Sequence, residues 1–352
     1  MGKYSSRNFN LDLLRFFACY LVIHQHASEF FYIGNNGSVV TGDNTFRIGI
    51  ITSLARISVP LFVMISGYLL LPMRGTTSEF FRKRFTRILY PFIAWCILYA
   101  LYYVIYRGDT FEQAMTNIIH IPVNFGVEVG HLWYIYMLIG LYLLVPVISP
   151  WLNSCSKREL QGYLLLWLAT TILPYIHQVY PQVLGECFWN PTPAFYYFNG
   201  FVGFLLSGYY IRKYGALSMP YAVVFTITGY AVTAGIFCSR INTSSIVPEL
   251  ELSWGFCTIN VAAMAYGVFS MFMHIKSKGE GRAGMLIKDI SINSYGIYLA
   301  HIIVLNMFFN AFNPIFSTTL VSVPLISVCT FICVYIIVKL LSYIPTSKYW
   351  LG

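Results

Sequence analysis

Apolar segments of about 20 residues follow one another along the whole chain. Ten can be distinguished, at roughly 11–33, 48–71, 86–106, 131–150, 160–177, 195–212, 220–239, 254–274, 288–310 and 320–343. Each is long enough to cross the hydrocarbon core of a bilayer as a helix. The fifth and sixth are the least regular, because Pro174, Pro191 and Pro193 crowd the stretch between them. The sequence therefore predicts an all-α integral membrane protein with about ten transmembrane helices.

Scarcity of charge excludes the other broad classes of protein. Asp, Glu, Lys and Arg make up 10% of the 352 residues, against about 25% in an ordinary soluble domain. Neither a soluble globule nor a disordered chain of this length fits so few charges. The eight cysteines follow no zinc-binding spacing, so no metal site is predicted. A disulfide between Cys187 and Cys238 is the only pairing that we consider.

Basic residues in the loops predict how the helices are oriented. The net charge of the chain is +9. If the N-terminus is cytoplasmic, 16 Lys and Arg residues lie in cytoplasmic segments and 3 lie in outside loops. Short cytoplasmic loops are enriched in Lys and Arg, which favours an N-in, C-in topology. The 16 are Lys3, Arg7, Arg74, Arg82, Lys83, Arg84, Arg87, Lys157, Arg158, Arg212, Lys213, Lys276, Lys278, Arg282, Lys288 and Lys348, and the 3 are Arg47, Arg107 and Arg240.

The chain has no linker and no internal repeat. We expect one transmembrane domain over residues 1–352, without an appended soluble domain, because the chain stops about nine residues after the last apolar segment. The first segment is not a cleaved signal peptide, since it is too long and too polar.

Polar residues in the first apolar segment point to chemistry, because such groups are costly inside a bilayer. Arg15 and His26 are eleven residues apart, which places them within about 20° on one helix face and about 16 Å apart along it. His24 lies on the opposite face. Glu29 is three residues after His26 and can hydrogen-bond its imidazole, and Asp12 is similarly placed to pair with Arg15. The alternative is that His26 only packs.

Further polar residues lie in or beside other segments. Arg56 lies inside the second segment and needs a partner or a watery cavity, whereas Ser66 and Gly67 lie near its end. Gly67 is best explained by close helix packing. Arg84 and Arg87 are spaced to point together at a phosphate where the third segment begins. Anchoring to lipid headgroups is the simpler explanation for their neighbours.

Two more histidines, His131 and His301, lie in the fourth and ninth segments, in the same outer half as His26. The arginines gather toward the predicted cytoplasmic side. A phosphorylated donor could be held by the arginines while its reactive end reaches the histidines. The chain contains no P-loop, no dinucleotide fingerprint and no HExxH, so nucleotide hydrolysis and zinc catalysis have no support.

Five ordered motifs resemble the acyltransferase 3 family of bacterial inner-membrane proteins. They are the Arg15-x10-His26 spacing, VPLFVMISGYLL, RFTRILYP, HLWYI and SYGIYLAH, and they extend from residue 12 to about 305. Within that family the chain is most similar to the stand-alone O-acetyltransferases of O-antigen, a part of lipopolysaccharide, or of enterobacterial common antigen. Some members carry an extracytoplasmic hydrolase-like domain, which we do not expect here.

The resemblance implies a multi-pass enzyme of the bacterial inner membrane. Its donor would be acetyl-CoA, with no tightly bound cofactor, and its acceptor a sugar hydroxyl of an envelope polysaccharide or of its polyprenyl-linked precursor. The expected catalytic residues are His26, Arg15, Glu29 and His301. The expected substrate-binding residues are Arg84, Arg87, Arg56, His131, Ser66 and Tyr298.

Three alternatives stay open. The same fold could transfer another acyl group such as succinyl, or the chain could export a polysaccharide or lipid-linked glycan. Transfer to the sugar could also need a separate protein. Membrane lipids are expected partners, nucleic acid is not, and homo-oligomerisation is left open.

Overall fold

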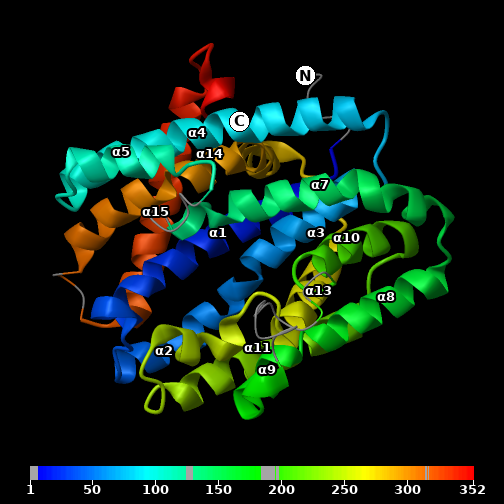
Figure 1. Ribbon diagram of the computed structural model, residues 1–352, viewed down its shortest axis with the longest axis horizontal. Helices are drawn as coiled ribbons and strands as arrows, with labels where there is room; N and C mark the ends of the chain where they lie inside the picture. The colour runs from blue at the N-terminus through cyan, green and yellow to red at the C-terminus, as the bar shows by residue number, and fades with distance from the viewer. Residues whose placement is uncertain (1–6, 124–129, 184–194, 196–197, 314, 316) are drawn as a thin grey trace.

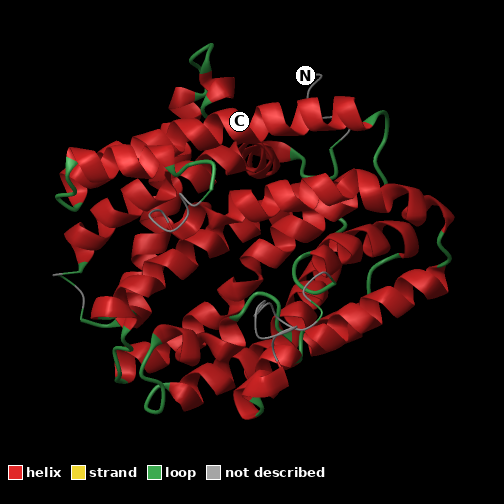
Figure 2. Ribbon diagram, in the orientation of Figure 1, coloured by secondary structure: helices red, strands yellow, loops and turns green. Residues whose placement is uncertain are grey.

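The computed structural model describes residues 7–123, 130–183, 195, 198–313, 315 and 317–352. These residues form helices joined by short loops (Figure 2), and their only β-structure is two isolated bridges, Ile33 with Val39 and Ser38 with Ile246. The all-α fold class predicted from the apolar segments is confirmed. Cys187 lies outside the described residues, and Cys238 is a free thiol.

The helices follow one another in this order along the chain. The α-helices are α1 (Phe9–Tyr32), α2 (Asp43–Thr52), α3 (Ser58–Leu70), α4 (Thr77–Tyr106), α5 (Phe111–Ile119), α7 (Trp133–Ser154), α8 (Lys157–Thr170), α9 (Leu173–Val179), α10 (Val202–Tyr214), α11 (Met219–Arg240), α12 (Val247–Leu250), α13 (Ile259–Met273), α14 (Gly281–Phe312) and α15 (Thr319–Leu341). The 3₁₀ turns are η1 (Asn35–Gly37), η2 (Ser53–Ile57), η3 (Gly130–Leu132), η4 (Pro181–Val183), η5 (Glu251–Trp254) and η6 (Ser347–Tyr349).

Six helical segments of the described chain are long and apolar enough to cross a membrane, and a seventh results if α12–η5 and α13 form one span bent by 42°. All seven overlap segments expected from the sequence. The six are Asp43–Leu70, Thr77–Tyr106, Gly130–Ser154, Met219–Arg240, Gly281–Phe312 and Thr319–Leu341. The protein is therefore a multi-pass membrane protein, while the count of ten and the N-in, C-in orientation stay predictions.

The three remaining expected segments differ from simple spans for physical reasons. α1 is 24 residues long, but Asp12, Arg15 and its histidines lower its hydropathy. The segment at 160–177 is divided into α8, which ends at Thr170, and α9, which begins at Leu173. A helix that continued through Pro174 would bring its ring against the carbonyl of Thr170. The start of the segment at 195–212 falls partly on residues 196 and 197, which lie outside the described residues, and α10 has 13 residues.

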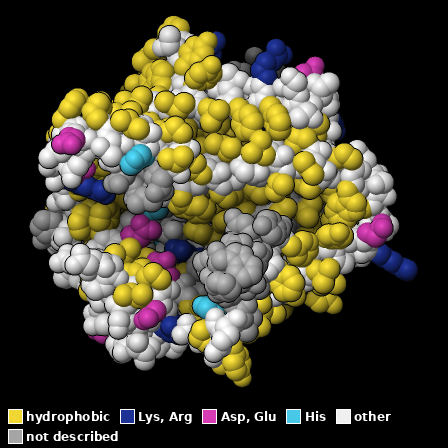
Figure 3. Space-filling model, viewed as in Figure 1, with side chains coloured by type: hydrophobic (Ala, Val, Ile, Leu, Met, Phe, Trp, Pro, Cys, Tyr) yellow, Lys and Arg dark blue, Asp and Glu magenta, His cyan; other side chains and the backbone are white. Residues whose placement is uncertain are grey.

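The polar helix α1 lies inside the protein. It packs against α3, α13, α14 and α15, and Figure 1 shows it running through the middle of the bundle. Protein neighbours therefore surround the polar groups that lipid would disfavour. By contrast, hydrophobic side chains spread in a broad band over the face shown in Figure 3. Ile105, Leu165, Ile227 and Leu340 are exposed examples on four different helices, as expected for a lipid-facing surface.

Gly67 has the packing role that its position in the sequence predicts. A Cβ atom added to Gly67 on α3 would lie 1.8 Å from the carbonyl oxygen of Leu205 on α10. On α10, a Cβ atom at Gly208 would lie 1.9 Å from the carbonyl oxygen of Met64. The two backbones therefore touch, as small residues allow in membrane helices.

Candidate active site

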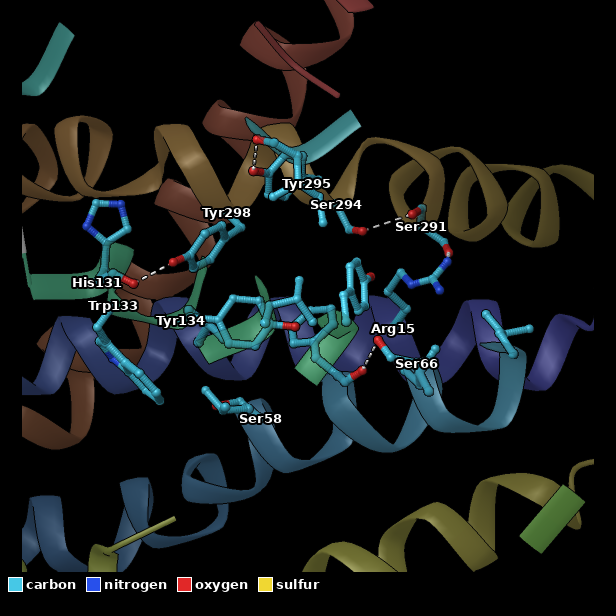
Figure 4. A pocket seen from close by; sticks show the side chains of 18 of the residues that line it. Arg15, Ser58, Ser66, His131, Trp133, Tyr134, Ser291, Ser294, Tyr295 and Tyr298 are labelled. Carbon is cyan, nitrogen blue, oxygen red and sulfur yellow. Dashed lines mark hydrogen bonds between the residues drawn. The ribbon is translucent and has the colours of Figure 1, made fainter. Parts of the chain in front are cut away.

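A cavity of about 420 Å³ lies between α1, α3, α4, α7 and α14. Seven of the side chains that the sequence singles out line it: Arg15, His26, Ser66, Arg84, Arg87, His131 and Tyr298. Figure 4 shows its length, with Arg15, Ser66 and Ser291 toward one end and His131 and Trp133 toward the other. We call these the arginine end (Arg15, Arg84, Arg87) and the histidine end (His26 and His131, with His301 buried behind them).

At the arginine end, three guanidinium groups converge from two helices. Arg15 on α1 donates a hydrogen bond to Ser291 Oγ, with a distance of 3.3 Å. Arg84 and Arg87 lie one turn apart on α4, and the Arg84 guanidinium lies over the Phe80 ring at 5.9 Å. Arg87 is exposed although it lines the cavity, so this end reaches the surface. Grouped guanidinium groups are suited to binding phosphate oxygens.

Asp12 does not pair with Arg15 as its spacing in the sequence predicts. Its carboxylate forms a salt bridge with Arg7 and accepts a hydrogen bond from Ser291 Oγ at 2.6 Å. The same serine contacts Arg15. Arg7 thus satisfies the buried carboxylate directly, and Arg15 keeps its guanidinium group toward the cavity.

The histidine end brings three imidazoles together from α1, η3 and α14. The ring centroids of His26 and His301 are 5.3 Å apart, those of His131 and His301 are 5.0 Å apart, and those of His26 and His131 are 6.3 Å apart. His26 and His131 line the cavity, whereas His301 lies fully buried behind them. Among the described residues, no group of three His, Cys, Asp or Glu could hold a metal ion.

Hydrogen bonds assign the tautomers of two of these imidazoles. Nδ1 of His26 lies 2.8 Å from the Glu29 carboxylate, and Nδ1 of His301 lies 2.5 Å from the Tyr298 carbonyl oxygen. Both partners accept hydrogen bonds, so each Nδ1 of a neutral ring carries the proton. Nε2 of His26 then has a free lone pair, which a general base requires.

Hydroxyl-bearing aromatic side chains also line the cavity. Tyr134 comes from α7, and Tyr295 and Tyr298 come from α14 (Figure 4). Tyr142 of α7 lines the cavity as well. The sequence did not single out Tyr134, Tyr142 or Tyr295 as site residues. Ser291, Ser294, Tyr295 and Tyr298 follow the i, i+3, i+4, i+7 spacing of one helix face, a signal that the sequence does contain.

Four buried polar atoms of cavity-lining residues have no hydrogen-bond partner, and one of them, Nε of Arg84, belongs to the arginine end. The other three are Oε1 of Gln25, Oγ of Ser58 and Nε2 of His131, and these three residues are more than nine-tenths buried. Buried polar atoms normally have partners. This group therefore fits a site for a hydrogen-bonding ligand beside His26. Neither Gln25 nor Ser58 stood out in the sequence.

Three predicted residues lie apart from the cavity wall. Glu29 is bonded to His26, and His301 is bonded to the Tyr298 carbonyl oxygen, and both partners line the cavity. Arg56 is buried behind the wall, where it donates to the Trp254 carbonyl oxygen at 2.7 Å and lies 3.7 Å from Glu251. As the helical spacing predicts, His24 faces away, toward Ser327 and the Ile51 carbonyl oxygen.

Comparison with protein families identifies the family of the chain. A family model described as an acyltransferase domain, that of the acyltransferase 3 family, matches residues 8–339. Neither a curated protein nor a solved structure matches the chain. The match includes every helix that contributes to the cavity. The chain therefore belongs to the acyltransferase 3 family of membrane acyltransferases.

Proposed function

We propose that this acyltransferase moves acetyl from acetyl-CoA to a sugar hydroxyl of an envelope polysaccharide or of its polyprenyl-linked precursor. The observation that carries the proposal is one cavity with three arginines at one end and a carboxylate-bound histidine at the other. In this proposal the cavity lies in a bacterial inner membrane, with its arginine end toward the cytoplasm.

The length of the cavity suits a CoA thioester. Arg15 and His26 are eleven residues apart on one helix, about 16 Å at 1.5 Å per residue. The phosphates of CoA would bind Arg84, Arg87 and Arg15, since guanidinium groups bind phosphate oxygens in a fork geometry. The pantetheine arm would extend along the tyrosines, which offer apolar rings and hydroxyl groups. The thioester would then lie beside His26.

His26 would act as the general base. Its Nε2 takes the proton of the sugar hydroxyl while the hydroxyl oxygen attacks the thioester carbonyl carbon. The carbon–sulfur bond breaks, and the leaving thiolate of CoA receives the proton from Nε2. Glu29 keeps the proton on Nδ1 throughout and stabilises the imidazolium formed in between. Gln25, Ser58 and His131 would bind the hydroxyl groups of the acceptor.

The proposal is tested by supplying purified protein with isotopically labelled acetyl-CoA or succinyl-CoA and a membrane extract that contains lipid-linked glycans. Labelled acetyl on a glycan, detected by mass spectrometry, is the expected result. Succinyl transfer in its place would correct the acyl group. Failure of both donors with protein that remains folded would refute the proposal. Comparing envelope glycans of deletion and complemented strains would identify the sugar and the hydroxyl position.

A further inference from the structure

A second carboxylate, Glu251, is joined through Tyr32 to the helix that carries His26 and Glu29. His26, Glu29 and Tyr32 follow one another at intervals of three residues on α1. The Tyr32 hydroxyl donates a hydrogen bond to Glu251, which comes from η5 and is more than 200 residues away in the sequence. Two carboxylates from distant parts of the chain thus approach the histidine end of the cavity.

Arg56 joins these carboxylates to the cavity wall. Its side chain is 6% exposed, with Nη2 3.7 Å from Glu251 Oε2 and Nε bonded to the Trp254 carbonyl oxygen at 2.7 Å. Its guanidinium carbon lies 4.7 Å from the centre of the Phe256 ring, which lines the cavity. Glu29 also lies within range of the Arg56 charge. Arg56 therefore forms an ion pair with Glu251 and lies within electrostatic range of Glu29.

The charges of this group do not cancel. Glu29 and Glu251 bring two negative charges, and Arg56 brings one positive charge. A buried guanidinium group needs a charged partner. If Glu251 were neutral, Glu29 would still lie within range of the Arg56 charge, and pairing with Arg56 would compete with its hydrogen bond to His26.

We propose that Glu251 and Arg56 are positioning residues for His26: Glu251 satisfies the guanidinium group of Arg56, so that the Glu29 carboxylate stays bonded to the imidazole. Both residues act through Glu29 and neither touches the cavity. The unbalanced negative charge then lies beside the His26 imidazole, which becomes positive when it takes a proton. This charge favours the proton transfer. This inference rests on the proposed role of His26 as a general base.

The test is a double-mutant cycle of Glu251→Gln and Arg56→Met with acetyl transfer as the readout. Glu251→Gln is expected to lower kcat about 10- to 100-fold, the range typical of carboxylates that orient functional histidines. The KM for acetyl-CoA should stay unchanged, because the arginine end is untouched. Arg56→Met alone should also lower kcat, since it leaves the two carboxylates without their shared cation. The double variant should exceed Glu251→Gln in kcat, because Glu29 then has no competing partner.

The control is Glu249→Gln, which neutralises a neighbouring exposed carboxylate that accepts a hydrogen bond from the Ser245 amide. It should behave as the wild type. If Glu251→Gln keeps the wild-type kcat, or if the double variant is no better than Glu251→Gln, the positioning role is refuted. Should Glu251→Gln fail to accumulate, Glu251→Asp provides the test, because the shorter side chain keeps the charge but withdraws the carboxylate from Arg56. A lower kcat at an unchanged KM is expected, and a wild-type kcat would refute the positioning role.

A second readout does not depend on the reaction. Diethyl pyrocarbonate acylates the free nitrogen of a neutral imidazole, and the labelling rate of His26 can be followed by mass spectrometry. We expect slower labelling of His26 in Glu251→Gln and the wild-type rate in Glu249→Gln. Equal rates in the two variants would overturn the inference. If wild-type protein transfers no acyl group but the labelling rates differ, the proposed function fails and the positioning role of Glu251 stands.

Discussion

Nδ1 of His26 and Oε2 of Glu29 lie 2.8 Å apart, one turn from each other on α1. Because both residues belong to one helix, their spacing is fixed by helix geometry rather than by the docking of separate helices. The pair therefore holds one tautomer of the imidazole even if the neighbouring helices shift as substrates bind. The sequence predicts this contact from an interval of three residues.

The role of the carboxylate can be tested by replacing Glu29 with Gln. The amide still accepts a hydrogen bond from Nδ1, but it no longer stabilises a positive imidazolium. We expect kcat to fall about 10- to 100-fold while the KM for acetyl-CoA stays the same. Glu112→Gln, at an exposed position in the first turn of α5, is a matched control. A parallel rise in KM would instead indicate a general distortion of the cavity.

The donor site makes a separate prediction about Arg84 and Arg87. Neutral substitution of either should raise the KM for acetyl-CoA by roughly 10- to 150-fold, which corresponds to the loss of about 1.5–3 kcal/mol from a charge-assisted hydrogen bond. Arg84→Lys should rescue binding only in part, because the planar fork is lost. Steady-state kinetics with varied acetyl-CoA provides the measurement.

Arg82→Gln serves as the control, because Arg82 is exposed on the same helix and does not line the cavity. It should leave the KM unchanged. If Arg84 and Arg87 variants insert normally and also leave the KM unchanged, both arginines only anchor α4 at the membrane surface.

Much of the cavity was predictable, because helix periodicity converts spacing into shared faces. Arg15 and His26 were expected on one face and line one cavity, and His24 was expected elsewhere and faces Ser327. The packing role of Gly67 was likewise evident from its position among small residues in an apolar segment. Such predictions need only the geometry of a single helix.

Contacts between distant segments could not be predicted in this way. Arg56 was expected to bind substrate, since nothing in the sequence shows that Glu251 and the Trp254 carbonyl oxygen satisfy it. Likewise, Asp12 had two arginines within reach along the chain, and only the docking of α14 places Ser291 between Asp12 and Arg15. The partners of Arg56 and Asp12 depend on tertiary packing, which composition and the helical spacing of residues do not reveal.

Packing of α3 on α10 gives a prediction about stability. Gly67→Ala should destabilise the protein by about 1–3 kcal/mol or more, because the new methyl group meets the Leu205 backbone, which cannot rotate away. Gly140→Ala on α7 should be tolerated, since nothing lies within 4 Å of the added Cβ atom. Thermal unfolding in detergent would compare the two variants. Equal stability would show that α3 and α10 are not in close contact in solution.

The predicted orientation can be tested by labelling single cysteines from outside the cell. His120→Cys and Ser277→Cys both lie at exposed positions, and the charge bias places 120 outside and 277 in the cytoplasm. A membrane-impermeant maleimide should therefore label the first in intact cells and the second only after the membrane is opened. Labelling in the reverse pattern would show that the orientation is opposite to the predicted one, with the arginine end of the cavity outside.

The two histidines of α1 provide the most direct test of the active site. They are two residues apart, yet the cavity is lined by His26, whereas His24 contacts Ser327 Oγ and the Ile51 carbonyl oxygen at 3.2 Å each. His26→Ala should reduce acetyl transfer about 10²- to 10⁴-fold, the usual contribution of a general base. His301 is too deeply buried to replace it. His24→Ala should retain most activity, and any loss should follow reduced stability. Activity of both variants must be compared at equal membrane abundance. An active His26→Ala variant beside an inactive His24→Ala variant would show that the reaction does not occur in this cavity.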